Sequence, residues 1–163
     1  MFREEYRHVL ERMPDARGND VKFRLIYDGP LPPEDRAPKG LKQQIRKQFH
    51  PQLRTLWAEH PQLSQLVERE VNLIADAYKK GNYRFVPLVR LANAMACRLD
   101  ILVLMRKEPY QVFSGDERGD LDNRIKTLID GLRMPRQPGE CNDALPDKGE
   151  DPFYCLLEDD KVV

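Results

Sequence analysis

The clearest alternation of hydrophobic and polar positions in this chain lies near residues 119–132. Its apolar members recur at the spacing of one face of an α-helix: Leu121, Ile125, Leu128, Ile129 and Leu132. Asp122, Lys126 and Asp130 recur every four residues and form a polar row on another face of the same helix. Asp120 stands where an N-cap residue belongs, after a glycine that lets the chain turn. The pattern therefore predicts a helix with a polar row beside an apolar stripe.

Other stretches alternate with a period of two, which is typical of strands. Residues 21–27 and 96–107 each place apolar side chains on one face, and the second stretch also carries Leu102 and Leu104 on its other face. We therefore expect both faces of that strand to be partly covered. Residues 83–89 form a third candidate, for which Pro87 predicts an edge position.

The remaining apolar periodicity is helical. Residues 2–13 predict a short amphipathic helix, and residues 39–80 predict a series of helices that Pro51 and Pro61 should break or start. Apolar side chains between Leu63 and Tyr78 form one clear stripe. The order α-β-α-α-β-β-α-β predicts an α+β fold, a mixed small sheet packed with helices, in a single domain over 1–163. Residues 133–153 predict an inserted loop because they are polar and rich in proline.

Composition narrows the class of protein. Charged residues make up 33% of the chain with a formal net charge of +0, which disfavours a protein that coats DNA but allows a local basic patch. The three cysteines are scattered without a metal-binding spacing, so we expect reduced thiols in a cytoplasmic protein. We see no apolar run of membrane-spanning length and no signal-peptide pattern.

Two acidic blocks supply the candidate chemistry. The first is the polar row of the helix, and the second is Glu158-Asp159-Asp160, which interrupts an apolar stretch that otherwise predicts a strand. Aspartates are rare in strands, so this pair indicates a turn or a ligand role. Mg²⁺ binds carboxylate oxygens. Taken alone, the helix also fits a purely structural interpretation, in which Asp120 is a cap and Asp122–Lys126 is a surface ion pair worth about 0.3–0.5 kcal/mol.

Together the two blocks resemble the RusA-type Holliday-junction resolvases, whose pattern is D-x-D-N-x-x-K-x-x-x-D-x-L followed by a D-D-x-x-V step. The matching positions are Asp120, Asp122, Asn123, Lys126, Asp130, Leu132, Asp159, Asp160 and Val163. The resemblance is strong over 119–132 and 156–163 and loose elsewhere. In the family the second block follows the helix after about ten residues and the chain continues with another strand, whereas here residues 133–153 intervene and the sequence ends at Val163.

The resemblance implies a small homodimeric, Mg²⁺-dependent endonuclease that cuts four-way DNA junctions symmetrically, in recombination and repair. It implies that Asp120, Asp122 and Asp160 bind the metal and that Asp159 is an auxiliary or supporting acid. Lys126 would be the catalytic lysine beside the scissile phosphate. Asn123 and Asp130 would support the site. The alternative is a non-catalytic nucleic-acid-binding or structural relative with the same fold.

A basic row offers candidate DNA contacts: Lys39, Lys42, Arg46 and Lys47. Arg118 is a separate candidate, which either contacts the DNA backbone or only balances Asp116 and Glu117. Each phosphate contact would add roughly one unit to the salt dependence of binding. A solvated helix face is the other interpretation of the four residues on 39–47. Two symmetric cuts require two active sites, so we expect a homodimer. Its interface would come from the stripe between Leu63 and Tyr78 or from the N-terminal helix.

Overall fold

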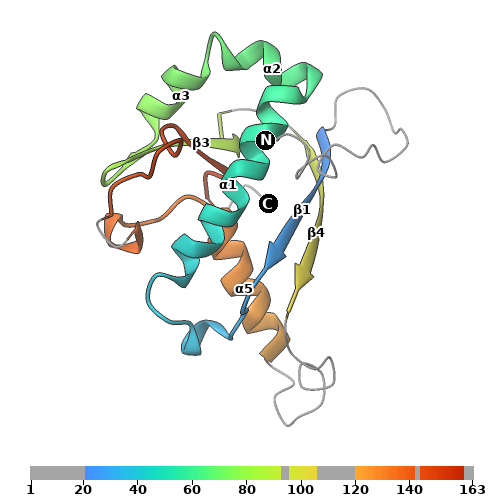
Figure 1. Ribbon diagram of the computed structural model, residues 1–163, viewed down its shortest axis with the longest axis vertical. Helices are drawn as coiled ribbons and strands as arrows, with labels where there is room; N and C mark the ends of the chain where they lie inside the picture. The colour runs from blue at the N-terminus through green and yellow to red at the C-terminus, as the bar shows by residue number, and fades with distance from the viewer. Residues whose placement is uncertain (1–20, 93–95, 106–119, 142–143, 160–163) are drawn as a thin grey trace.

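A computed structural model describes residues 21–92, 96–105, 120–141 and 144–159 of the chain. The expected N-terminal helix therefore lies outside the described residues. Figure 1 shows α1 (Leu41–Glu59) running through the middle of the molecule, with β1 (Val21–Asp28) and β4 (Cys97–Leu104) on one side. The other elements are α2 (Pro61–Val67), α3 (Val71–Ala77), β2 (Lys79–Lys80), β3 (Tyr83–Val89), α5 (Asp120–Leu132) and β5 (Phe153–Leu157), with short 3-10 helices at Glu34–Arg36 and Pro138–Cys141.

The strands form two small sheets. β1 and β4 pair in parallel, with Val21 opposite Cys97. β3 lies between β2, which is antiparallel, and β5, which is parallel. The fold is thus mixed α+β, as predicted. β3 is the middle strand of its sheet, but Pro87 pairs with β5 on one side only, because β2 reaches no further along β3 than Arg84. Within the described strands, the predicted edge position holds for this stretch of β3 and not for the strand as a whole.

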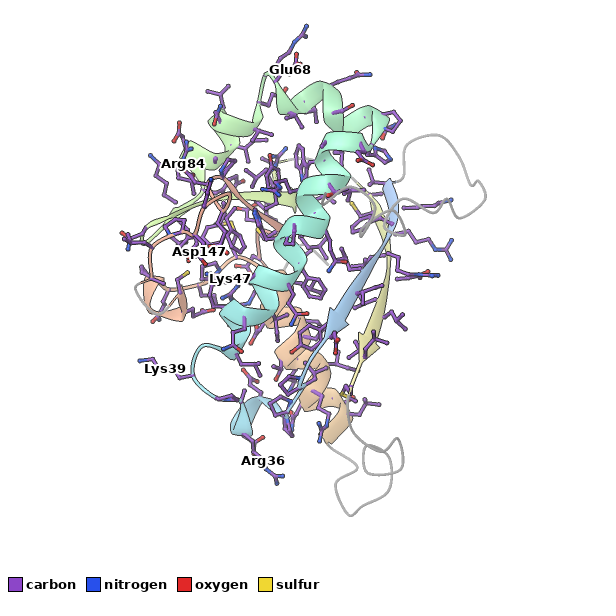
Figure 2. The ribbon with its side chains drawn as sticks, viewed as in Figure 1. Arg36, Lys39, Lys47, Glu68, Arg84 and Asp147 are labelled. Atoms are coloured by element: carbon purple, nitrogen blue, oxygen red, sulfur yellow. The ribbon has the colours of Figure 1, made fainter. Side chains whose placement is uncertain are left out.

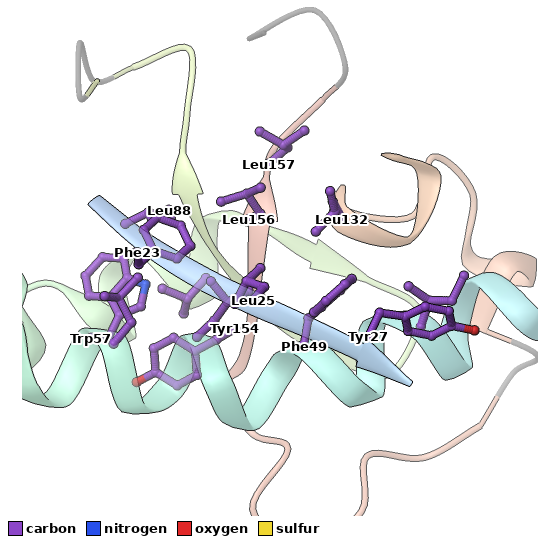
Figure 3. Packing of buried hydrophobic residues seen from close by; sticks show 14 of the residues in the cluster. Phe23, Leu25, Tyr27, Phe49, Trp57, Leu88, Leu132, Tyr154, Leu156 and Leu157 are labelled. Carbon is purple, nitrogen blue, oxygen red and sulfur yellow. The ribbon is translucent and has the colours of Figure 1, made fainter. Parts of the chain in front are cut away.

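Helix α1 organises the core. It contacts β1, β5, α2 and α5. Its buried face carries Phe49, Leu53 and Trp57, which belong to one core cluster with alternate residues of β1 and with residues of β5. Figure 3 shows Phe49 and Trp57 beside Tyr27 and Tyr154. β1 buries every second side chain, because a strand with one face on the core alternates in this way. All five residues of β5 are buried.

Two side chains of α1 occupy the free edge of β1. The Gln52 amide donates to the carbonyl of Ile26 at 2.7 Å and accepts from its N–H at 2.9 Å. The Gln48 amide makes the same pair of contacts with Asp28, at 2.9 Å and 3.2 Å. These amides replace the hydrogen bonds that a neighbouring strand would supply to an edge.

One expectation about the helices was wrong. Pro51 lies inside α1 and does not end it, whereas Pro61 does begin α2. An internal proline costs about 3 kcal/mol, and here buried residues on both sides of it hold the helix together. The stripe from Leu63 to Tyr78 spans two short helices, and it packs against the core of its own chain.

The faces of β4 differ from expectation as well. Its alternate residues from Cys97 to Val103 pack against the core, but Leu102 and Leu104 on the other face are 46% and 45% exposed. None of the described helices combines the length and hydrophobicity that a membrane span requires.

Candidate functional site

The predicted motif helix is α5, and its polar row divides into two parts with different surroundings. Asp130, near the C-terminal end, accepts hydrogen bonds from Lys42 of α1 and from Arg133 at 2.9 Å. Lys42 also pairs with Glu34 at 3.2 Å. Asp130 therefore joins α5 to α1 and to the loop between β1 and α1, which is a supporting role.

Arg46 of α1 completes the attachment of α5. Its guanidinium is fully buried and donates to the carbonyl oxygens of Arg133 at 2.8 Å and Asp130 at 3.0 Å. It also pairs with Glu140 at 2.8 Å. The last carbonyls of a helix have no partner within the helix, so Arg46 satisfies two backbone groups at this end of α5 and one carboxylate.

The ion pairs lower the pKa values of the Asp130 and Glu140 carboxyl groups. Burial alone would raise the pKa of Asp130, but the hydrogen bond from Lys42 and the charge of Arg133 outweigh it, and the pKa lies below its ordinary value. The pKa of Glu140 is lowered in the same way, with burial opposed by Arg46 and by Arg133. Both groups are therefore charged at neutral pH.

A glycine lets the two helices approach closely at this point. A Cβ added to Gly131 would lie 2.3 Å from Cγ2 of Ile45 on α1. No real Cβ packs at that distance. The helix crossing that brings Arg46 to the end of α5 thus depends on the missing side chain.

The part of the polar row that lies in the N-terminal half of α5 has no such contacts. Asp122 and Lys126 are exposed, and neither forms a hydrogen bond or ion pair with another described residue, including each other. The surface ion pair between the described side chains of Asp122 and Lys126, which the structural interpretation predicted, is therefore absent from the structure. Leu121 and Ile125 of the apolar stripe are also 44% and 43% exposed. The Asp120 side chain lies outside what the structure describes, as does Arg118.

A cavity of about 360 Å³ adjoins this half of α5. It is lined by Met105, by Arg124 of α5 and by the loop from Asp28 to Pro32. Arg124 is buried and donates to the carbonyl of Leu31 at 2.7 Å, and Thr127 donates to that of Pro32 at 3.1 Å. The proline-rich loop after β1 is thus fastened to α5 by side chains on the face opposite Asp122.

The second acidic block follows β5 directly. The strand ends at Leu157, whose carbonyl accepts from Met134 N–H at 2.8 Å, beyond the C-terminal end of α5. Asp159 lines a cavity together with Arg133. Asp122 lies eleven positions before Arg133, or about 16 Å along a helix axis. Asp160 lies outside the described residues, so the convergence of the two acidic blocks on one ion stays a prediction.

Within the described side chains, no three His, Cys, Asp or Glu residues lie close enough to hold a metal ion. Of the four expected ligands, Asp122 and Asp159 are described. The Asp122 carboxylate is exposed and has no polar partner among the described residues, and carboxylate oxygens suit a hard cation.

The basic residues at 39–47 have different surroundings, and their contact with DNA stays a prediction. Lys39 is exposed, but Lys42 and Arg46 are held by acids of this chain, as described above. Lys47 pairs with Asp147 at 2.6 Å and Glu150 at 3.3 Å, both from the inserted loop (Figure 2). The residues predicted to meet phosphates thus mainly fasten α5 and the loop 133–153 to α1. That loop was expected as an insertion, and its packing was missed.

His50 joins the same loop to α1. Its Nδ1 accepts the N–H of Tyr154 at 2.9 Å, so the proton resides on Nε2, which donates to the carbonyl of Gly149 at 3.0 Å. The ring stacks on Phe153 at a centroid distance of 4.5 Å. Burial lowers the pKa of His50, which keeps the ring neutral.

Comparisons with protein-family models, with curated proteins and with solved structures find no match to this chain.

Proposed function

We propose that this protein is a Mg²⁺-dependent, structure-selective endonuclease that resolves four-way DNA junctions, of the RusA type. The observation that carries the proposal is the division of α5. Asp130 of the polar row is used to hold the fold, whereas Asp122 and Lys126 are exposed one turn apart without a polar partner among the described residues. An acid and a lysine without polar contacts to the described residues, on a helix held in place by Asp130, Arg124 and Thr127, are suited to act on a ligand.

The roles follow from the motif. Asp122, with Asp120 and Asp160, would hold Mg²⁺, and Asp159 would be the auxiliary acid. The bound ion would supply Lewis-acid stabilisation of charge on the phosphoryl oxygens. Lys126 lies on the same face of α5 as Asp122, so its ammonium offsets negative charge that develops at the scissile phosphate. Asp130 and Arg46 keep the helix in place for both groups.

The proposal includes a homodimer, because one chain carries one site and a symmetric resolution needs two cuts. The stripe from Leu63 to Tyr78 is an unsuitable interface, since its members Leu63 and Val71 are buried in the core of the same chain. The exposed Leu121 and Ile125 beside the site are apolar surface that a second copy is able to cover.

The test is incubation of a synthetic four-way junction with the protein, with and without Mg²⁺. We expect paired, symmetric nicks that require the metal, and no nicks by Asp122→Asn. The matched control is Glu68→Gln, an exposed acid between α2 and α3, far from α5 (Figure 2). It should cleave like the unaltered protein. Binding of the junction without cleavage at any Mg²⁺ concentration would reject the enzyme and leave the non-catalytic DNA-binding alternative.

A further inference from the structure

A second cavity, of about 450 Å³, lies between elements that are distant in sequence. Its walls come from the end of α3, from β2, from the segment that follows α5 and from the two residues after β5. Its volume is in the range of protein sites for small ligands or for part of a larger one. It borders the segment after the C-terminal end of α5, and it is also lined by Asp159, the auxiliary acid of the proposed site.

The charges on the walls are mainly positive. Four cationic side chains line the cavity: Lys79, Lys80, Arg133 and Arg136. Two carboxylates, Glu158 and Asp159, oppose them. Four positive and two negative groups leave an excess of two positive charges, in a chain whose formal net charge is +0. A concave surface with one dominant sign raises the local concentration of ligands of the opposite sign.

Several of these groups are already held by the protein. Arg133 pairs with Asp130 and donates to the carbonyl of Met134 at 2.8 Å. Glu158 accepts from the Tyr78 hydroxyl at 3.2 Å and from the Leu91 N–H at 2.8 Å, so its carboxylate is directed to neighbours in the wall. Arg133 and Glu158 thus shape the cavity.

The two lysines of β2 are more available. Lys79 pairs with Asp76 at 3.3 Å, but both side chains are more than half exposed, and such surface pairs are weak. Lys80 is half-buried and forms no hydrogen bond or ion pair with any described residue. Its ammonium is therefore able to bind a ligand without breaking a polar contact to any described residue.

We propose that this cavity binds a phosphodiester of the DNA backbone, with Lys80 as the main contact and Lys79 as the second. The proposal rests on the proposed function, because it gives the DNA a path past the C-terminal end of α5. Lysine binds phosphate as a point charge on a flexible stem, which suits a contact to the backbone that carries no base sequence. Asp159 lines the same cavity, so a strand held here lies beside the second acidic block.

The experiment measures binding separately from cleavage. Fluorescence anisotropy of a labelled four-way junction, and of a linear duplex with the same arm sequence, is followed in EDTA over a series of salt concentrations. Lys80→Ala should raise the Kd about threefold and make the salt slope shallower by about 0.9, the expectation for one lost phosphate contact. Lys80→Glu should raise the Kd roughly tenfold, since a repulsive charge is added.

The matched control is Lys22→Ala. Lys22 is also a half-buried strand lysine without a polar contact to the described residues, but it lies on β1, away from the cavity. It should leave the Kd and the salt slope unchanged. An unchanged Kd and slope for Lys80→Glu, in a protein whose Trp57 fluorescence shows normal folding, would overturn the proposal.

The two proposals fail in distinguishable ways. If the protein cleaves the junction in Mg²⁺ but the Lys80 variants bind it with an unchanged Kd, the cavity is not a DNA contact and the endonuclease proposal stands. If the Lys80 variants bind the junction more weakly but the protein does not cleave it, the cavity is a DNA contact and the endonuclease proposal is rejected. Lys80-dependent binding of labelled polyglutamate, with no binding of the junction or of the duplex, rejects both the phosphodiester and the endonuclease and assigns the cavity to an acidic protein segment.

Discussion

The two halves of α5 share one helix and one polar row, yet the protein uses them differently. Around Asp130 the side chains of Lys42, Arg46 and Arg133 are buried or half-buried and bonded to α5 or to its neighbours. Around Asp122 and Lys126 the helix faces solvent. The polar residues of α5 recur at the same spacing throughout. Those at the C-terminal end have a structural role, and those at the N-terminal end have a catalytic role in our proposal. Burial and the presence of a partner distinguish the two roles, whereas residue type does not.

The largest expected effect is the loss of stability when the buried contacts at the C-terminal end of α5 are removed. Arg46→Ala leaves Glu140 and two carbonyl oxygens of the helix end without their donor. Removing one partner of a buried ion pair costs about 3–5 kcal/mol in the free energy of unfolding. Urea unfolding followed by the fluorescence of Trp57, the single tryptophan, measures this loss. The control Arg69→Ala, an exposed arginine, should change stability by less than about 0.5 kcal/mol. Equal effects of the two variants would show that the buried contacts of Arg46 do not stabilise this end of α5.

A substitution at the exposed N-terminal end of α5 should reduce cleavage strongly and stability only slightly. Lys126→Ala should cost under about 1 kcal/mol of stability, because the side chain has no partner among the described residues. Junction cleavage should fall on the order of a hundredfold, as when one donor to a transition state is removed. Single-turnover cleavage and urea unfolding of the same preparation provide both numbers. Lys148→Ala, an exposed lysine of the inserted loop, is the control. Near-normal cleavage by folded Lys126→Ala would remove the lysine from the mechanism.

A smaller loss of stability is expected at the helix crossing. Gly131→Ala places a methyl group 2.3 Å from Ile45 Cγ2, and such overpacking costs about 1–3 kcal/mol even though alanine favours helices. Gly139→Ala is the matched control, since nothing lies within 4 Å of the added Cβ. Thermal unfolding should show a lower Tm for the first variant only. A Tm that rises for Gly131→Ala would mean that α1 and α5 separate readily.

The smallest effect is the dependence of stability on pH. Because burial lowers the pKa of His50, the unfolded chain takes up a proton near its ordinary value of about 6.5 while the folded chain does not. Stability should therefore fall as pH drops below about 6.5. A further fall should follow below about pH 4.5, where Asp130 and Glu140, whose pKa values are lowered by folding, are protonated in the unfolded chain.

Urea midpoints between pH 8 and pH 3 give the profile. His50→Gln should flatten the first fall, leaving a remainder from His60, whose pKa burial also lowers. A midpoint that is constant from pH 7 to pH 5 in the unaltered protein would contradict the neutral, buried His50.

Strong periodicity explains which elements the sequence predicted. β1, β3, β4 and α5 each carry a clear pattern of apolar residues, and the structure confirms them. Pro51 misled the prediction because local propensity was outweighed by burial on α1. The ion pairs of the basic row were not predicted, for another reason. The partner of Arg46 is Glu140, 94 residues away, and that of Lys42 is Asp130, 88 residues away. Spacing along the chain carries no information about such pairs.

The glutamine amides on β1 have a consequence for self-association. A strand from a second molecule that tried to extend the sheet beside Ile26 and Asp28 would have to displace Gln48 and Gln52 and break four hydrogen bonds. α1 therefore protects this edge against fibre-like stacking of copies, a hazard of open strand edges. Replacing both glutamines with alanine would expose a template for aggregation at a place that has no part in the proposed chemistry.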